Sequence, residues 1–158
     1  MQSTENDAVY PPVRGLAAWL QLVRTYNHIE AIISSDLRAD DLTLARVHVM
    51  AALDFHGPMS QQAVADRLRV TKGNIVGLVN KLSTRGLVQR TVSKTDRRFN
   101  LLCITPAGRE VMERIMPRQH KLIAKLMSPL TEAEATLLEK MLTRLDGVQL
   151  EVVAGKQA

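Results

Sequence analysis

Residues 60–105 read "SQQAVADRLRVTKGNIVGLVNKLSTRGLVQRTVSKTDRRFNLLCIT", and this stretch decides the fold. A serine precedes a short helical segment, 61–68, and Thr71 precedes a second helical segment that runs to Arg85. Serine and threonine are favoured at helix N-caps, and a glycine such as Gly86 commonly follows the end of a helix. The spacing therefore predicts a helix-turn-helix over 61–85.

The second of these helices has one apolar and one slender polar face. Its apolar residues recur at the i, i+3, i+4 and i+7 positions that share one buried face: Ile75, Leu78, Val79 and Leu82. The opposite face has no acidic residue and consists of Gly73, Val76, Gly77, Asn80 and Thr84, with Lys72, Asn74 and Lys81 on its flanks. Such a face suits the major groove of DNA. The alternative is that small outward residues permit another helix to pack closely.

A charged turn separates two short apolar segments, about 87–91 and 99–104, which we predict to be strands of a hairpin. The turn carries Lys94, Asp96, Arg97 and Arg98. A narrow minor groove concentrates negative potential, and arginine loses less hydration than lysine on entering it. We interpret the hairpin as a wing that probes DNA, with Arg97 holding phosphate at the edge of the groove.

Positive charge is concentrated in this stretch. Residues 60–100 hold nine basic and two acidic side chains, a net charge of +7, whereas the whole chain carries +5. Segregated positive charge on a small helical domain indicates a surface for a polyanion, since a merely solvated face mixes both signs.

The rest of the chain is predicted to be helical. Caps and stop signals place helices at about 16–37, at 44–56 between Thr43 and Gly57, from Pro106 after Thr105, and after a capping box of Thr131 and Glu134. The expected fold is mainly α with a small β-hairpin wing. A winged helix-turn-helix at 42–105 is flanked by helical dimerisation regions at 12–41 and 106–154, which carry more apolar positions than one winged helix covers.

Composition narrows the class of protein. Apolar residues make up 46% of the 158 residues and aromatic residues only 3%, which is typical of an aliphatic helical core. No apolar run reaches the roughly 18 residues of a membrane span. The polar N-terminus is unlike a signal peptide, and a single cysteine excludes an internal disulfide. We therefore expect a cytoplasmic protein with no membrane partner.

Signals of catalysis and metal binding are missing from the sequence. It has no glycine-rich phosphate loop, no serine elbow and no carboxylate pair in an apolar setting, and its four histidines lack zinc-ligand spacing. We expect no enzyme activity, no cofactor and no metal site. Cys103 lies among Leu101, Leu102 and Ile104 and is expected to be a small buried hydrophobe. A redox-sensing thiol, which requires exposure, is the alternative.

Two segments, "VTKGNIVGLVNKLSTRGLVQR" and "KTDRRFNLLCITPAGRE", resemble the recognition helix and wing of the MarR family of bacterial transcription regulators, over about 42–110. The resemblance implies a homodimer with interlocked terminal helices, in which each subunit presents a winged helix to half of a pseudo-palindromic operator. It places Arg98 in the minor groove, oriented by Asp96, beside Lys94. The remaining implied DNA contacts are Ser60 and Gln61, at phosphate, and Thr71, Lys72, Gly73, Asn74, Gly77 and Lys81. Many members carry a long polar residue where this chain has Gly77, so direct base readout is expected to be sparse.

The first two helices also carry candidates for binding an effector. Trp19 and Arg24 lie in the first helix, and Arg46 and His48 in the second. Aromatic surface beside cationic or neutral donors suits a small aromatic or phenolic carboxylate, the effector class that the MarR family often senses. Trp19 is equally consistent with an ordinary dimer core. The resulting hypothesis is a repressor released by such a ligand; the alternatives are a redox-responsive regulator and a winged-helix protein-interaction module that does not bind DNA.

Overall fold

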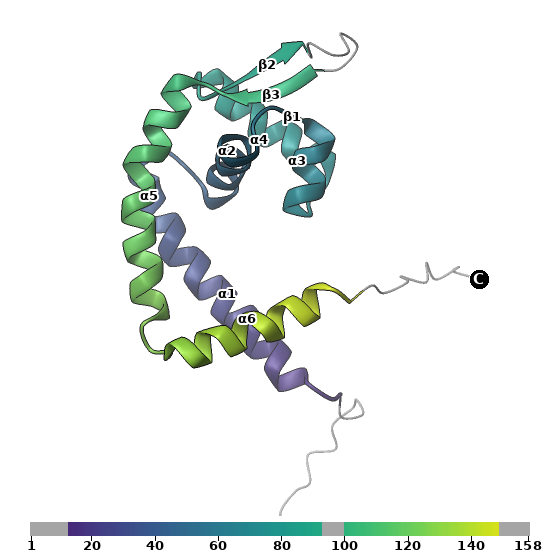
Figure 1. Ribbon diagram of the computed structural model, residues 1–158, viewed down its shortest axis with the longest axis vertical. Coiled ribbons are helices and arrows are strands. Elements are labelled where there is room, and N and C mark those ends of the chain that lie inside the picture. The colour runs from purple at the N-terminus through teal and green to yellow at the C-terminus, as the bar shows by residue number, and fades with distance from the viewer. Residues whose placement is uncertain (1–12, 93–99, 149–158) are drawn as a thin grey trace, which may run out of the picture. The chain divides into compact units, whose positions relative to one another are not determined.

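The computed structural model describes residues 13–92 and 100–148 of the chain. It is mainly helical, with one small antiparallel sheet (Figure 1). In chain order the elements are α1 (Leu16–Leu37), the 3-10 helix η1 (Arg38–Asp40), α2 (Leu44–His56), β1 (Met59–Ser60), α3 (Gln61–Leu68), α4 (Lys72–Thr84), β2 (Val88–Val92), β3 (Asn100–Ile104), α5 (Pro106–Met127) and α6 (Glu132–Asp146). This order confirms the predicted fold class.

Helix N-termini form where the sequence places hydroxyl caps. The side chains of Thr43, Ser60, Thr71 and Thr131 each accept a hydrogen bond from the backbone N–H three residues later. At α6 the capping box is complete, because Glu134 accepts in return from the backbone N–H of Thr131. Each such cap stabilises its helix by about 1 kcal/mol. The predicted starts of α2, α3, α4 and α6 are therefore confirmed.

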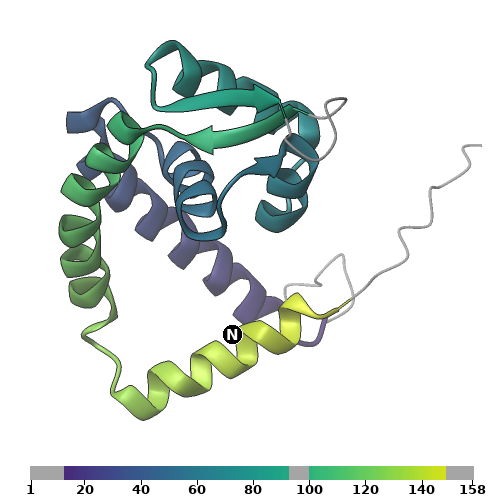
Figure 2. The same ribbon diagram turned by 45° about the horizontal axis from the view of Figure 1, so that its top comes forward.

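The sheet contains a strand that the sequence did not predict. Its order is β1-β3-β2, and both pairings are antiparallel (Figure 2). Strand β1 has only two residues, too few for an alternating pattern, and it pairs Met59 with Leu102. Strand β2 begins and ends one residue later than predicted, and Phe99, expected in β3, lies outside the described residues.

The core of the winged helix lies between its helices and one face of the sheet. Helix α4 contributes Ile75, Val79 and Leu82, each fully buried, whereas Leu78, predicted on the same face, is half-buried. The sheet contributes Val88, Leu102 and Ile104, and helix α2 contributes Val49, Met50 and Leu53. No helix in the described parts of the chain is long and apolar enough to cross a membrane.

The strand pattern corrects the expectation for Cys103. Leu102 and Ile104 are buried, so the alternation of β3 turns Cys103 toward the other face of the sheet, where it is half-buried rather than buried. Its Sγ atom lies 3.2 Å from Oγ1 of Thr91 on the neighbouring strand. The thiol therefore has a polar neighbour instead of an apolar cage.

The chain divides into two compact units, Met1–Pro117 and Arg118–Ala158, with the boundary inside α5. The first unit contains the winged helix together with α1, whose Ile33 and Leu37 are buried. In the second unit, α6 has no buried residue. This division concerns contacts within one chain, so the dimerisation role expected for 12–41 and 106–154 stays a prediction.

The start of α5 is held closely against the loop that follows α4. Oγ1 of Thr105 donates a 2.6 Å hydrogen bond to the carbonyl oxygen of Gly86 and accepts one of 3.0 Å from the backbone N–H of Gly108. A Cβ atom added at Gly108 would lie 2.7 Å from Cγ1 of Ile104 and even closer to the carbonyl oxygen of Leu87. Only glycine allows this approach of helix and backbone.

Gly108→Ala is therefore expected to lower the free energy of unfolding by about 1–3 kcal/mol, because the backbone of Leu87 cannot move aside as a flexible side chain would. Chemical denaturation at one fixed protein concentration measures the change. Gly77→Ala is the matched control: no described atom lies within 4 Å of the added Cβ, and alanine in a helix is about 0.5–1 kcal/mol more favourable than glycine. Equal stability of Gly108→Ala and the parent would contradict this close approach.

Candidate nucleic-acid interface

Helices α3 and α4 and the turn between them form the candidate surface. Arg69 ends α3 in the left-handed conformation, with φ 53°, and Thr71 then caps α4. A turn this short fixes the direction of α4 relative to α3. The predicted helix-turn-helix is present, with α4 ending one residue earlier than expected, at Thr84.

The outer face of α4 is open, as the sequence predicts. The predicted contact residues on it are exposed: Thr71, Lys72, Gly73, Asn74, Gly77 and Lys81. A Cβ at Gly77 would meet no described atom within 4 Å, and one at Gly73 would meet only Oγ1 of Thr71, at 3.9 Å. Among the described residues, these glycines therefore do not serve close helix packing, and they leave the backbone of α4 open to a ligand.

A hollow of about 300 Å³ beside this face brings together residues from five elements, β1, α3, α4, β2 and β3. Ser60, Gln61 and Lys72, three of the predicted contacts, line it together with Gln62, Arg90 and Asn100. Among the described residues, the lining includes two cations and no carboxylate. Sequence reasoning counted Arg90 among the basic residues but assigned no role to it, and it missed Gln62 and Asn100.

Arg90 reaches the helix from the strand. Val88 is buried, and Arg90, two residues further along β2, lies on the same face of the strand, toward α4. Its Nη2 donates a 2.7 Å hydrogen bond to Oδ1 of Asn80 on the outer part of α4. The period-two pattern of β2 was the signal in the sequence that could have identified this arginine.

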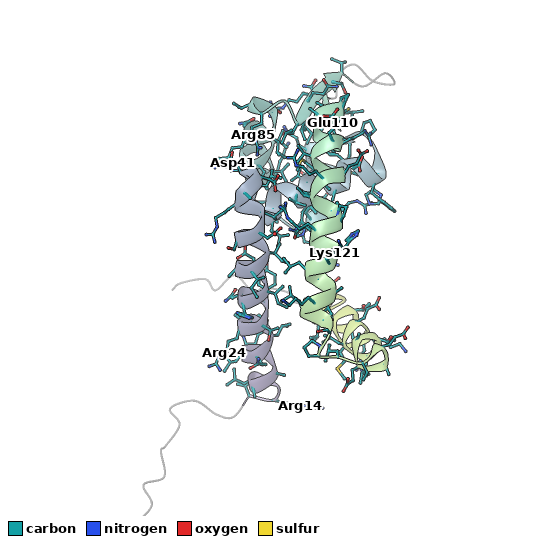
Figure 3. All side chains as sticks on the ribbon, turned by 90° about the vertical axis from the view of Figure 1, so that its left-hand side faces the viewer. Arg14, Arg24, Asp41, Arg85, Glu110 and Lys121 are labelled. Carbon is teal, nitrogen blue, oxygen red and sulfur yellow. The ribbon has the colours of Figure 1, made fainter. Side chains whose placement is uncertain are left out.

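Some of the clustered positive charge has a structural task. Arg85 donates hydrogen bonds of 2.6 Å and 2.9 Å to the carbonyl oxygens of Asp41 and Asp40, and it forms an ion pair with the carboxylate of Asp41 (Figure 3). It thereby fastens the end of α4 to the η1 turn. Arg85 is one of the nine basic residues of 60–100, so the charge available to a polyanion is smaller than the sequence count.

The predicted wing residues Lys94, Asp96, Arg97 and Arg98 lie outside the described residues. The strands that flank them are described, and their antiparallel register runs from Val88 opposite Ile104 to Val92 opposite Asn100. The hairpin of the predicted wing is confirmed, whereas the roles of its four charged residues stay predictions.

Comparison with known proteins identifies the family. The model of the MarR family matches residues 40–98, which include the helix-turn-helix and strand β2. The transcriptional regulator MhqR of Bacillus subtilis is 27% identical over 132 residues, which are 84% of this chain and 91% of MhqR. Over residues 40–98 the chain thus carries a domain of the MarR family of transcription regulators. Its matched relatives are regulators, not enzymes.

Solved structures of MarR-family regulators share the fold of this chain. BpsR of Bordetella bronchiseptica, described with regulation of its DNA binding by 6-hydroxynicotinic acid, has a TM-score of 0.80 at 24% identity and covers 89% of this chain and 100% of its own. A mutant of MarR from E. coli in complex with operator DNA has a TM-score of 0.77 at 19% identity. The match covers 85% of this chain and 99% of the MarR chain.

The four effector candidates do not converge within this chain. Trp19 is 61% exposed, and it lies about 21 Å along the axis of α1 from the buried Ile33. Arg24 lies near the end of α1 remote from Asp41 (Figure 3), whereas Arg46 donates a 3.1 Å hydrogen bond to the carbonyl oxygen of Asp41. A site containing both ends of α1 would need a second chain.

The chemistry of the two candidates on α2 differs. Partial burial lowers the pKa of His48 below its usual value, so at pH 7 its imidazole offers a carboxylate a neutral N–H donor and not a positive charge. Nε of Arg46 is buried and has no hydrogen-bond partner among the described residues.

Across residues 13–92 and 100–148, no group of three His, Cys, Asp or Glu side chains could hold a metal ion.

Proposed function

We propose that this MarR-family regulator is a homodimer that binds a pseudo-palindromic DNA operator, represses transcription there, and is released by a small aromatic or phenolic carboxylate. The observation that carries the proposal is a hollow in which Ser60, Gln61 and Lys72 meet beside the open outer face of α4, with no carboxylate among the described residues that line it. We place the protein in the cytoplasm, because that is where a bacterial operator is reached.

The outer face of α4 would enter the major groove. Lys81 and Asn74 would reach base edges or phosphates, while Gly73 and Gly77 allow the helix backbone to approach the DNA closely. The N-terminus of α3, with Ser60 and Gln61, would contact the phosphate backbone and set the register. We assign Lys94, Asp96, Arg97 and Arg98 to the wing contact at the adjacent minor groove.

Exposed apolar side chains on the terminal helices support a dimer. On α6, Leu137 is 52% and Leu145 61% exposed, and on α1 Trp19 is 61% exposed. Large apolar side chains gathered on one helix face in water mark an interaction surface. A second copy of the chain is the partner that would also supply the two-fold symmetry of a pseudo-palindromic operator.

The test of operator binding is a gel-shift titration with the DNA upstream of the chain's own gene, in the presence of excess unrelated DNA. The expected result is a discrete complex that survives a competitor excess of about 10³-fold, the lower end of the usual specificity ratio. A protein that bound this DNA, and DNA fragments selected from a random pool, no better than the competitor would refute the proposed function.

A ligand that releases the operator must be coupled to DNA in both directions. We place its carboxylate at Arg46, whose buried Nε has no partner among the described residues, with Arg24 and His48 as further candidates and Trp19 at the ring. BpsR, with 6-hydroxynicotinic acid, supports this ligand class. Aromatic acids can be titrated while the fluorescence of Trp19, the single tryptophan, is followed. Operator DNA is expected to weaken ligand binding by about 5–150-fold, and the ligand is expected to weaken DNA binding by the same factor.

Ligand binding that is indifferent to operator DNA would refute the effector part of the proposal while leaving DNA binding intact. Arg46→Lys is the informative variant. It keeps the charge but removes the guanidinium geometry that holds a carboxylate with two parallel hydrogen bonds. The affinity of this variant for the ligand is expected to fall, and its affinity for the operator alone is expected to be retained.

A further inference from the structure

The hydrogen bond between Arg90 and Asn80 joins the wing strand to the recognition helix at the edge of the hollow described above. Arg90 is exposed, lines the hollow and donates from Nη2 to Oδ1 of Asn80 over 2.7 Å. Neither side chain contributes to the core, since both are exposed. The pair therefore adds only modestly to stability, and it holds the guanidinium at the edge of the hollow.

The partner of Arg90 is neutral. A carboxamide accepts a hydrogen bond without cancelling charge, whereas an aspartate would form an ion pair and neutralise the guanidinium. Among residues 13–92 and 100–148, no carboxylate forms an ion pair with Arg90. Asp66, one turn from the start of α3, accepts instead from Nε2 of Gln62. Within the described residues, no ion pair therefore balances the positive charge of Arg90, and the bond to Asn80 orients its guanidinium.

The hollow has the size and chemistry for one phosphate group. A volume of about 300 Å³ equals the liquid volume of about ten water molecules, enough for a phosphate and its remaining hydration. Arg90 and Lys72 supply the positive charge, while Ser60, Gln61 and Asn100 supply hydroxyl and amide donors. A guanidinium has five N–H donors, so the bond to Asn80 leaves others for phosphate oxygens.

We propose that Arg90 binds a phosphate of the operator backbone in this hollow, and that Asn80 is a positioning residue that orients Arg90 without neutralising it. This inference rests on the proposed DNA-binding function and adds to it two residues outside the expected contacts. Held from both the strand and the helix, Arg90 fixes the wing and α4 to the same stretch of backbone. Phosphate contacts of this kind set register and do not read sequence.

The test measures the dependence of operator affinity on salt concentration for the parent and for Arg90→Gln, Asn80→Asp and Asn80→Ala. Each lost phosphate contact lowers the slope of log affinity against log salt by about 0.9, so Arg90→Gln should lower it by about 2 per dimer and weaken binding at 0.1 M salt roughly 10–100-fold. Asn80→Asp should lower the slope similarly, because it neutralises Arg90. Asn80→Ala should weaken binding several-fold and leave the slope unchanged, because the charge stays.

The double variant Asn80→Ala with Arg90→Gln separates a positioning role from direct base contact. If Asn80 acts through Arg90, the double variant binds as Arg90→Gln does. An equal cost of Asn80→Ala in both backgrounds would overturn the positioning role, and an unchanged slope in Arg90→Gln would overturn the phosphate contact. Unchanged thermal unfolding of each variant shows that the fold is intact. A parent that binds no operator would refute the proposed function itself, whereas a binding parent with indifferent variants refutes only this inference.

Discussion

Operator affinity is expected to fall by roughly 10³–10⁵-fold between 50 and 200 mM salt, because 6–10 contacts between basic side chains and phosphates would release condensed counterions. In each protomer, the candidates for these phosphate contacts are Lys72, Lys81 and Arg90 from the described surface, together with Lys94 and Arg97 of the wing turn. Arg85 is left out because it is bonded to Asp40 and Asp41. The measurement is a series of anisotropy titrations of labelled operator at four or more salt concentrations.

The control for this experiment is the folded protein without DNA. Ion pairs between exposed side chains contribute little to stability, so the midpoint of thermal unfolding should shift by only a few degrees over the same salt range. A flat salt response of DNA binding would contradict the electrostatic mechanism. An equally steep loss of folded protein would mean that salt acts on the fold instead of on the complex.

Removal of the residues after Leu130 is expected to weaken operator binding by about 10²–10⁴-fold, although the winged helix remains. The deletion removes α6, whose exposed Leu138, Met141 and Leu142 are assigned to the dimer. A dimer that binds both half-sites at once has a higher affinity, by about this factor, than a single winged helix that binds one half-site. Sedimentation of the shortened chain should give the mass of a monomer, and a gel shift should measure its affinity.

A point variant tests the same surface without deleting a helix. Leu142→Glu places a charge on the exposed apolar face of α6, and Thr136→Glu places the same charge on the opposite face of that helix. The first variant is expected to shift the protein toward monomer and to lose affinity, while the second is expected to behave as the parent. A monomer with undiminished affinity for the full operator would contradict the dimer and its part in DNA binding.

Local signals in the sequence determined the helices and the class of protein. A hydroxyl side chain at an N-cap acts within three residues, so Thr43, Ser60, Thr71 and Thr131 could be recognised without the fold. The 3.6-residue spacing on α4 likewise identified most of its buried and its open face, although Leu78, predicted to be buried, and Val76, predicted to face outward, are both half-buried. The charge of 60–100 and the hairpin were equally readable, and together they indicated a winged helix that binds DNA.

Contacts between residues distant in the chain were decided only by the tertiary structure. The two-residue strand β1 exists because β3 pairs with it, and Gly108 must be glycine because the backbone of Leu87 passes beside it. The hydrogen bond from Arg90 to Asn80 forms because β2 lies against α4. Arg85 bonds to Asp41, and is thus not counted among the residues that contact DNA, because the η1 turn lies beside the end of α4. Sequence spacing carries no direct information on such approaches, because they arise from the packing of the whole core.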